Sequence, residues 1–368
     1  MKRLLLFFAL MLCCLCASAQ QFAYDAKFDY IFLNREFDRS HNIFEQSGTL
    51  HAARLTPLVG LDWNQSRLAR HSLRVGVDVF RNMGEGLPAG DVFNEVLLYY
   101  RADIPVRRGR GSFSAIAGIF PRSFSEGYYS DAFFSDEVCY LDNNFEGMFF
   151  KYRTNHFYAD LGLDWCGMKG FTRREAFRIM SAGRAGLFGT DMLGFGWSAS
   201  MFHYAGSETV RGVVDNTLVN PYIVADFSSV TPVQVLSLLA GPLVGYQWDR
   251  VAEPKARMPW GLESVLTIQN WNVGLEDIFY HGDDMYLLYD QYGESVYYGE
   301  PFYNWPWEGR SWFDKLSVYW QPRIAHCISL RVSVELFFGE KTDSCPVLYR
   351  GTNQKLTFLF DLDKLTRR

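Results

Sequence analysis

The segment 277–311 carries the densest set of side chains that could bind a ligand. It holds seven acids and eleven aromatic residues, and Arg310 is its single Lys or Arg. Aromatic faces can stack on the C–H faces of a sugar while carboxylates accept bonds from its hydroxyls, and clustered oxygens could equally hold Ca²⁺. The candidate binding residues are Asp283, Asp284, Tyr297, Tyr298, Trp305 and Trp307. The structural alternative is that the rings sit at a membrane interface and the acids solvate the loop.

A second segment, 122–145, has a similar composition. It contains seven aromatic residues and five acids, with Arg122 as the only opposing cation. A loop of this length could fold inward and narrow a channel, or pack over its mouth. The sequence leaves both arrangements open.

A third group of charges recurs at every second position within apolar segments, which places the group on one face of extended chain. If those segments close into a barrel, this face lines the lumen. The charges would then select solutes in an open channel, or pair with one another and block it. The predicted lumen-lining residues are Arg74, Asp78, Arg101, Asp103, Arg153, Asp160, Asp164, Arg178, Arg184, Glu263, Arg331 and Glu335, and Arg54 and Lys151 fall on the same face.

Catalytic motifs are weak. The chain has no GxSxG, no HExxH and no phosphate-binding glycine loop, and no CxxC or Cys/His cluster indicates zinc. An outer-membrane lipid hydrolase would need a Ser/His pair with an acid. His203 is the most suggestive histidine, but it falls on the apolar face near a strand end. We therefore expect no enzyme, no metal site and no cofactor, apart from the Ca²⁺ alternative in the loops.

The N-terminus predicts export. Met1-Lys2-Arg3 is basic, 4–16 is an apolar run and Ala17-Ser18-Ala19 suits signal peptidase, so we expect a signal peptide at 1–19 and one domain at 20–368. Without Lys2 and Arg3 the formal charge is −7, which argues against a nucleic-acid partner. The remaining cysteines, which an oxidising compartment could pair in any of three ways, are Cys139, Cys166, Cys327 and Cys345.

The elements that position these residues have the two-residue period of β-strands. In 328–338, for example, Ile, Leu, Val and Phe alternate with Ser, Arg and Glu, and the same pattern recurs in 71–81, 156–166 and 355–362. Such segments run about ten residues, near the 9–11 that a tilted strand needs to cross a bilayer. A soluble two-sheet sandwich is the alternative, but it would expose an apolar face on strand after strand.

About sixteen strands fit the pattern, or fourteen if the weaker segments are excluded. They begin near residues 23, 50, 72, 93, 112, 147, 157, 175, 194, 218, 233, 260, 271, 312, 328 and 355. Short links alternate with long ones at 122–145, 205–217, 249–258, 277–311 and 339–354. This alternation predicts an all-β, transmembrane, antiparallel up-and-down barrel with long external loops. At sixteen strands a barrel has room for water, so we expect an open lumen.

The sequence resembles the porin-like outer-membrane β-barrel proteins of Gram-negative bacteria. The resemblance rests on the alternating strands, the Ala-Ser-Ala-Gln-Gln cleavage region at 17–21, and the segments 118–122 and 145–147. It implies insertion into outer-membrane lipid by the barrel-assembly machinery, and it allows a homo-oligomer. Such barrels often end on an aromatic residue, whereas the last aromatic here is Phe360 and the chain ends at Arg368.

Three functional hypotheses follow. The first is a passive channel for small hydrophilic solutes. The second is a surface barrel whose aromatic and acidic loops capture a glycan or a partner. The third is a lipid hydrolase, which substitution of His203 would inactivate.

Overall fold

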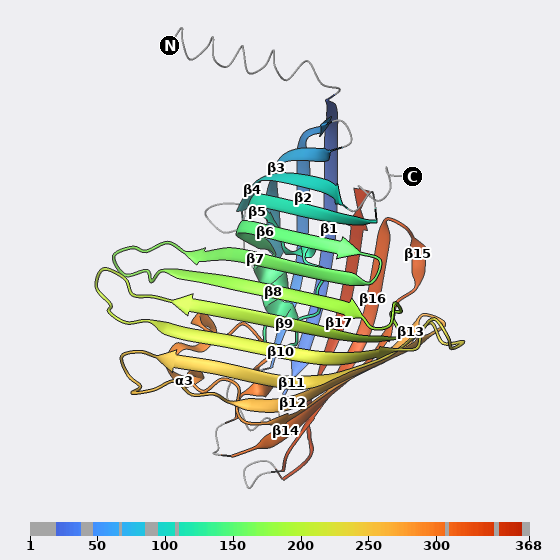
Figure 1. Cartoon of the computed structure of the whole chain (residues 1–368). Coiled ribbons are helices and arrows are strands. Elements are labelled where there is room, and N and C mark those ends of the chain that lie inside the picture. The colour runs from blue at the N-terminus through green and yellow to red at the C-terminus, as the bar shows by residue number, and fades with distance from the viewer. Residues whose placement is uncertain are drawn as a thin grey trace.

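The strands form one continuous antiparallel sheet that returns to its first member. The computed structural model describes residues 20–37, 47–65, 68–84, 95–106, 110–305, 309–341 and 346–362. Each wall strand pairs with the next along the chain, and the last strand pairs with the first, so the sheet closes into a barrel (Figure 1). Sixteen strands make the wall, because β15 (Arg323–Ala325) is three residues long and pairs only with β16. The predicted fold class and strand number are confirmed.

The strand bounds match the predicted strands one for one. The wall strands are β1 (Gln21–Glu36), β2 (Gly48–Gln65), β3 (Ala69–Asn82), β4 (Glu95–Val106), β5 (Gly111–Pro121), β6 (Asn144–Thr154), β7 (Phe157–Gly167), β8 (Ala176–Gly186), β9 (Leu193–Tyr204), β10 (Val214–Asp226), β11 (Val235–Asp249), β12 (Trp260–Asn270), β13 (Val273–Gly282), β14 (Ser311–Trp320), β16 (Ile328–Gly339) and β17 (Tyr349–Asp361).

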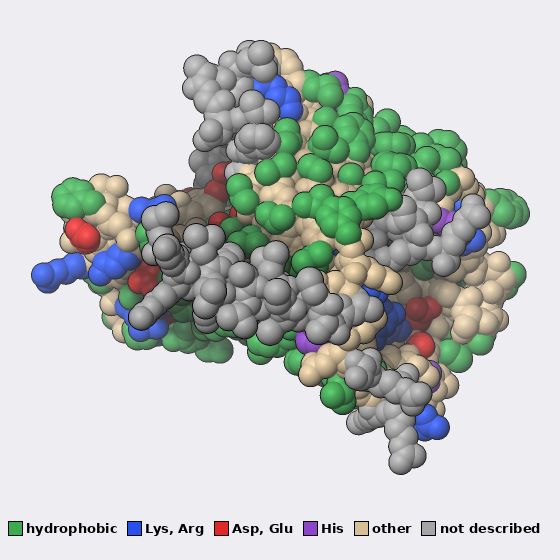
Figure 2. Space-filling view, turned by 90° about the horizontal axis from the view of Figure 1, so that it is seen from above, with side chains coloured by type: hydrophobic (Ala, Val, Ile, Leu, Met, Phe, Trp, Pro, Cys, Tyr) green, Lys and Arg blue, Asp and Glu red, His purple; other side chains and the backbone are tan. Residues whose placement is uncertain are grey.

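The two faces of the wall differ as the alternation predicts. On β16, Val332 and Val334 point outward and are 36% and 44% exposed, while Ser333 and Glu335 between and beside them are buried inside. Figure 2 shows hydrophobic side chains gathered across the outer wall, with charged side chains beside the hollows. An apolar outer band around a polar interior is the pattern of a barrel that lipid surrounds.

The connections separate by length at the two ends of the barrel. At one end, here called the turn end, lie both termini of the sheet, the facing ends of β2 and β3 and of β4 and β5, and the connections 155–156, 187–192, 227–234, 271–272 and 321–327. The opposite end, here called the loop end, carries the longest connections, among them 122–143 between β5 and β6 and 283–310 between β13 and β14.

Three predicted loop boundaries were wrong. The smallest error is in the loop predicted at 205–217, which ends at 213 because β10 begins at Val214. The loop predicted at 277–311 begins only at residue 283, because β13 continues to Gly282 and Asp277 lies on its outer face. The loop predicted at 339–354 ends at 348, because β17 begins at Tyr349. A register shift between Phe337 and Phe338 breaks the alternation where β17 starts, which explains why the pattern hid these residues.

Within the described residues, the helical elements all lie in the two longest loops. The β5–β6 loop contains η2 (Arg122–Phe124) and α2 (Asp136–Leu141), and Figure 1 shows α2 inside the barrel behind the front wall. The β13–β14 loop contains α3 (Tyr289–Tyr292), η3 (Gly293–Ser295) and η4 (Pro301–Tyr303). None of the helices in the described ranges has the length and apolar character needed to cross a membrane. The predicted signal peptide at 1–19 lies outside the described residues.

The orientation of the wall gives a first prediction. Val75 points outward from β3 and is 45% exposed, whereas Ser72 on the same strand is buried on the inner face opposite Asp62. In lipid vesicles, Val75→Lys should lower the free energy of unfolding by about 2–4 kcal/mol, because the ammonium would enter hydrocarbon. Ser72→Lys, which adds the same charge on the inner face, should cost clearly less. Equal losses would contradict the assigned faces.

Candidate functional site: the lumen and its two inward loops

The β5–β6 loop crosses the lumen from one wall to the opposite one. At its start, Ser125 Oγ donates a hydrogen bond of 2.9 Å to Asp160 on β7. Further along, Asp136 on α2 forms an ion pair with Lys355 on β17. Between β7 and β17 lie six wall strands in one direction and eight in the other, so the two anchors face each other across the barrel.

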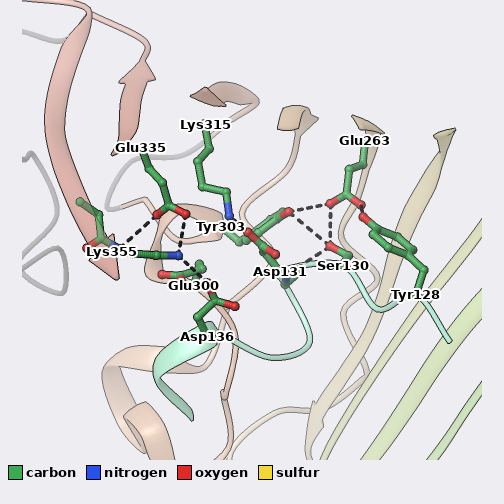
Figure 3. A network of polar contacts seen from close by, with 12 residues as sticks. Tyr128, Ser130, Asp131, Asp136, Glu263, Glu300, Tyr303, Lys315, Glu335 and Lys355 are labelled. Atoms are coloured by element: carbon green, nitrogen blue, oxygen red, sulfur yellow. Dashed lines mark hydrogen bonds and ion pairs between the residues drawn. The ribbon is translucent and has the colours of Figure 1, made fainter. Parts of the chain in front are cut away.

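Buried cations on the wall hold the acids of this loop (Figure 3). Lys315 on β14 pairs with Asp131, and Lys355 pairs with both Asp136 and Glu335, the latter at 2.6 Å. The positive charge of Lys355 lowers the pKa of Asp136. Because both lysines are at most 7% exposed, loss of their carboxylate partners would leave buried ammonium groups uncompensated.

Three hydroxyl groups surround Glu263, which is 1% exposed on β12. Tyr128 and Ser130 of the β5–β6 loop donate to its carboxylate at 3.0 and 2.6 Å, and Tyr303 of the β13–β14 loop donates at 2.6 Å (Figure 3). One wall carboxylate therefore ties both inward loops to the barrel. A carboxylate can accept several such bonds, and charge-assisted bonds of this kind are stronger than neutral ones.

The twelve predicted lumen residues all lie on the inner face, and several contact the β5–β6 loop. Arg153 pairs with Glu126 at 2.8 Å, and Asp164 pairs with Arg122 at 2.8 Å. The other contacts are Arg74 with Asp62 at 2.7 Å, Asp78 with Arg54 at 2.6 Å, Arg101 with Asp103 at 2.8 Å, Arg184 with the Asp191 carbonyl at 2.9 Å, and Arg331 over the Tyr319 ring at 3.9 Å. Lys151, on the same face, pairs with Glu126 at 2.6 Å.

Arg178 joins both loops to β8 through aromatic rings. Its guanidinium lies 4.0 Å from the ring centre of Tyr298 and 4.9 Å from that of Phe134, and the residue is 2% exposed. Cation–π contacts gain strength when they are desolvated, as here. This predicted lumen charge therefore stabilises the loops and is withdrawn from water.

The predicted binding residues of the β13–β14 loop are mostly packed inward. Tyr297 and Trp305 are 3% and 4% exposed and belong to one buried cluster with Tyr286, Phe302 and Tyr303. Tyr298 is partly buried against Arg178, while Asp283 pairs with Arg310 at 3.2 Å. Burial raises the pKa of Asp284 to about 7. Trp307 lies outside the described residues. These rings form a core at the loop end rather than an exposed platform.

The turn end of the lumen is hollow. A cavity of about 530 Å³ is lined by charged residues of β1 to β4, including Lys27, Asp62, Arg74 and Arg101. A second cavity, of about 370 Å³, lies beside Tyr128 and strands β6 to β13. Phe124 lines the first cavity and Glu126 the second, so the beginning of the β5–β6 loop separates them.

Other predicted chemistry finds little support in the geometry. Within the described ranges, no group of three or more His, Cys, Asp or Glu side chains could hold a metal ion. Cys139, Cys166 and Cys327 are free thiols, and Cys345 lies outside the described residues. His203 Nδ1 lies 3.0 Å from Asp215 Oδ1 on the outer wall, and its ring stacks on Phe177. In the described part of the chain no Ser or Thr hydroxyl is bonded to His203.

The predicted set of lumen-lining residues left out three inward residues that matter here: Lys315, Lys355 and Glu276. Lys315 shares its face of β14 with Phe313 and Tyr319, so the inner face looked aromatic. The two-residue alternation of the last strand did place Lys355 opposite its apolar face, but nothing in the sequence indicated that Asp136 would reach it. Strict use of this alternation on each strand would have put all three residues in the lumen-lining set.

Comparisons with known proteins agree on the fold. No protein-family model matches the sequence, and no curated protein does. Among solved structures, a loop L8 deletion mutant of OmpT, an outer membrane protein of Vibrio cholerae, is similar to this chain. The alignment covers 93% of this chain and 99% of the OmpT chain, with 10% identity and a TM-score of 0.54. OmpF of Salmonella typhi covers 92% and 97%, with 9% identity and a TM-score of 0.50. The anion-selective porin of Comamonas acidovorans covers 93% and 99%, with 8% identity and a TM-score of 0.50.

This chain has the outer-membrane porin fold. The likeness extends over nearly the whole barrel, whereas the identity of 8–10% leaves the lumen side chains to be judged from this chain alone. Within this porin fold, the particular features are the ion pairs that hold the β5–β6 loop and the aromatic core that the β13–β14 loop adds.

The seating of the β5–β6 loop gives a second prediction. A Cβ on Gly127 would lie 2.2 Å from Cβ of Ala182 on β8, so only glycine allows this close approach. Gly127→Val should lift the loop from the wall and speed chymotrypsin cleavage within 122–143 in the folded barrel. Gly48→Val is the control, because a Cβ at Gly48 meets nothing within 4 Å. Unchanged cleavage of the Gly127 variant would contradict the observed seating.

The buried carboxyl group of Asp284 gives a third prediction. Its pKa of about 7 lies above the usual value of about 4, so the docked loop favours the protonated form. Packing of the β13–β14 loop against the barrel should therefore be strongest at acidic pH, and it should weaken as the pH rises from about 4 to about 7. The measurement is the hydrogen-exchange protection of the Tyr286 amide, which donates to Asp284 Oδ1 at 2.8 Å. Asp284→Asn should remove the pH dependence, while Asp290→Asn on α3 should keep it; a flat wild-type profile would contradict the assignment.

Proposed function

We propose that the protein is a porin-like channel of the outer membrane that passes small hydrophilic solutes by diffusion. A sixteen-stranded barrel is wide enough for an aqueous channel, and the apolar outer wall suits lipid. The observation that carries the proposal is the β5–β6 loop, which crosses the lumen from β7 to β17 and narrows it. The signal at 1–19 and the barrel-assembly machinery would bring the chain to that membrane.

The inward loops set the character of the channel. Acids of the β5–β6 loop face wall cations, including Lys151, Arg153, Lys315 and Lys355. These ion pairs hold the loop across the lumen, so solutes would pass the charges that stay in contact with water, such as Arg101 and Arg153, and these favour polar solutes over apolar ones. Because the loop-end half also contains the buried aromatic cluster, the resting channel is narrow and its conductance is low.

Planar-bilayer conductance of the purified chain tests the proposal and supplies a fourth prediction. Replacing 284–309 with a short Gly-Ser turn removes the Tyr303 bond to Glu263 and the loop-end core, so conductance should rise several-fold. Shortening the β9–β10 loop within 205–213 is the control and should leave conductance unchanged.

If neither the wild type nor the shortened variant conducts ions in the bilayer, the channel proposal is wrong. That result would favour the second candidate, a docking barrel. The burial of Tyr297 and Trp305 does not favour this candidate, because neither ring faces solvent. The hydrolase hypothesis is tested separately by lipid turnover with His203→Ala.

A further inference from the structure

The smaller cavity at the turn end combines an apolar floor with charged residues at its edge. Arg153 and Glu126 pair with each other at 2.8 Å, while Arg184 and Glu276 lie on separate strands. Its floor is formed by Tyr222, Val224, Leu239 and Val265 of strands β10 to β12, all at most 9% exposed. Tyr128 of the β5–β6 loop covers this floor, with its ring edge-on to Tyr222 at 5.5 Å between centroids. At about 370 Å³ the cavity falls in the usual size range of small-molecule sites.

The floor is built for close contact with a flat or branched apolar group. The ring of Tyr222 lies over Gly196, where a Cβ would approach the ring to 2.3 Å. It therefore lies flat against the wall, and Tyr128 contacts part of its other face. Val224, Leu239 and Val265 pack in the same buried cluster, with Ile278 behind them. An apolar side chain placed here would leave water for a preformed hydrophobic surface.

At one end of the floor, on β13, the Glu276 carboxylate lines the cavity without an ion pair or hydrogen bond to the described residues. Two cations nearby on the inner wall, one on β14 and one on β16, are engaged elsewhere. Lys315 pairs with Asp131, and Arg331 lies over the Tyr319 ring. The carboxylate is thus available to a cation that enters from the lumen.

At the other end, on β8, Arg184 offers the opposite charge. One of its nitrogens donates to the Asp191 carbonyl at 2.9 Å, and the Asp226 carboxylate is 3.8 Å away. The side chain is 35% exposed and lines the cavity. A guanidinium is well suited to bind a carboxylate in two-bond geometry. The β10–β12 floor lies between this cation and Glu276.

We propose that this cavity is a subsite for small zwitterions with an apolar body, of the kind that a short hydrophobic peptide provides. The α-ammonium group binds Glu276, the carboxylate binds Arg184, and the apolar side chains lie on the floor beside Tyr128. The inference rests on the proposed function, because it names a solute class for the same lumen. Neutral sugars, which lack both charges, would leave the two ends unpaired.

Isothermal titration of the full chain in detergent tests the subsite with leucyl-leucine as the probe. N-acetylation removes the ammonium charge and C-terminal amidation removes the carboxylate, so each blocked peptide should bind roughly tenfold more weakly, a difference of about 1.4 kcal/mol. Glu276→Gln should abolish the preference for the free amino end while keeping the preference for the free carboxylate. Arg184→Gln should do the reverse, and Arg184→Lys should restore part of the preference.

The matched controls carry the same residue changes in the exposed β9–β10 loop, Glu208→Gln and Arg211→Gln, and should bind leucyl-leucine as the wild type does. Circular dichroism of each variant verifies the barrel. Absence of leucyl-leucine binding, or equal affinity for the blocked peptides, would overturn the subsite. If the barrel conducts but does not bind leucyl-leucine, only the proposed subsite is wrong. If it binds leucyl-leucine but does not conduct, only the proposed channel is wrong.

Discussion

Ten backbone pairs between β1 and β17, from Lys27 with Asp361 to Glu36 with Thr352, close the sheet, and every other feature depends on that closure. An open sheet would present two rows of unpaired N–H and C=O groups, which hydrocarbon cannot satisfy. With the edges joined, side chains alone decide which face meets lipid and which meets water. The apolar outer wall and the ionic inner wall are therefore two consequences of one constraint.

Closure also fixes the distance across the lumen that the loops must span. A single chain segment can touch β7 and β17 only because the ring holds these strands opposite each other. The inner wall then satisfies its buried charges with that segment: Glu263 through hydroxyl groups, and Lys315 and Lys355 through carboxylates. Because the contacts concentrate toward the loop end, the turn end stays hollow and keeps charged groups such as Arg101, whose side chain is 30% exposed, near water.

The fold was predictable because each strand carries its own two-residue pattern. All sixteen wall strands were found, and the errors lie where the pattern is locally broken, as at the bulge preceding β17. The inward faces of Asp160, Glu263 and Glu335 followed from parity. The loop partners of the inner wall did not, because Ser130 reaches Glu263 and Asp136 reaches Lys355 over separations of more than a hundred residues that no local pattern encodes. For the same reason Tyr297 and Trp305 resembled an exposed binding surface, although they pack inside.

The most direct measurement of the central claim is cross-linking of the first and last strands. Tyr30 and Phe358 are register partners on β1 and β17, and Cα atoms of such partners lie about 4.5–5.5 Å apart, within reach of a disulfide. In a background with the native cysteines replaced by serine, Tyr30→Cys with Phe358→Cys should form a disulfide on mild oxidation in lipid vesicles. Tyr30→Cys with Phe150→Cys on β6 should not. Failure of the first pair in an inserted, folded protein would contradict a closed barrel.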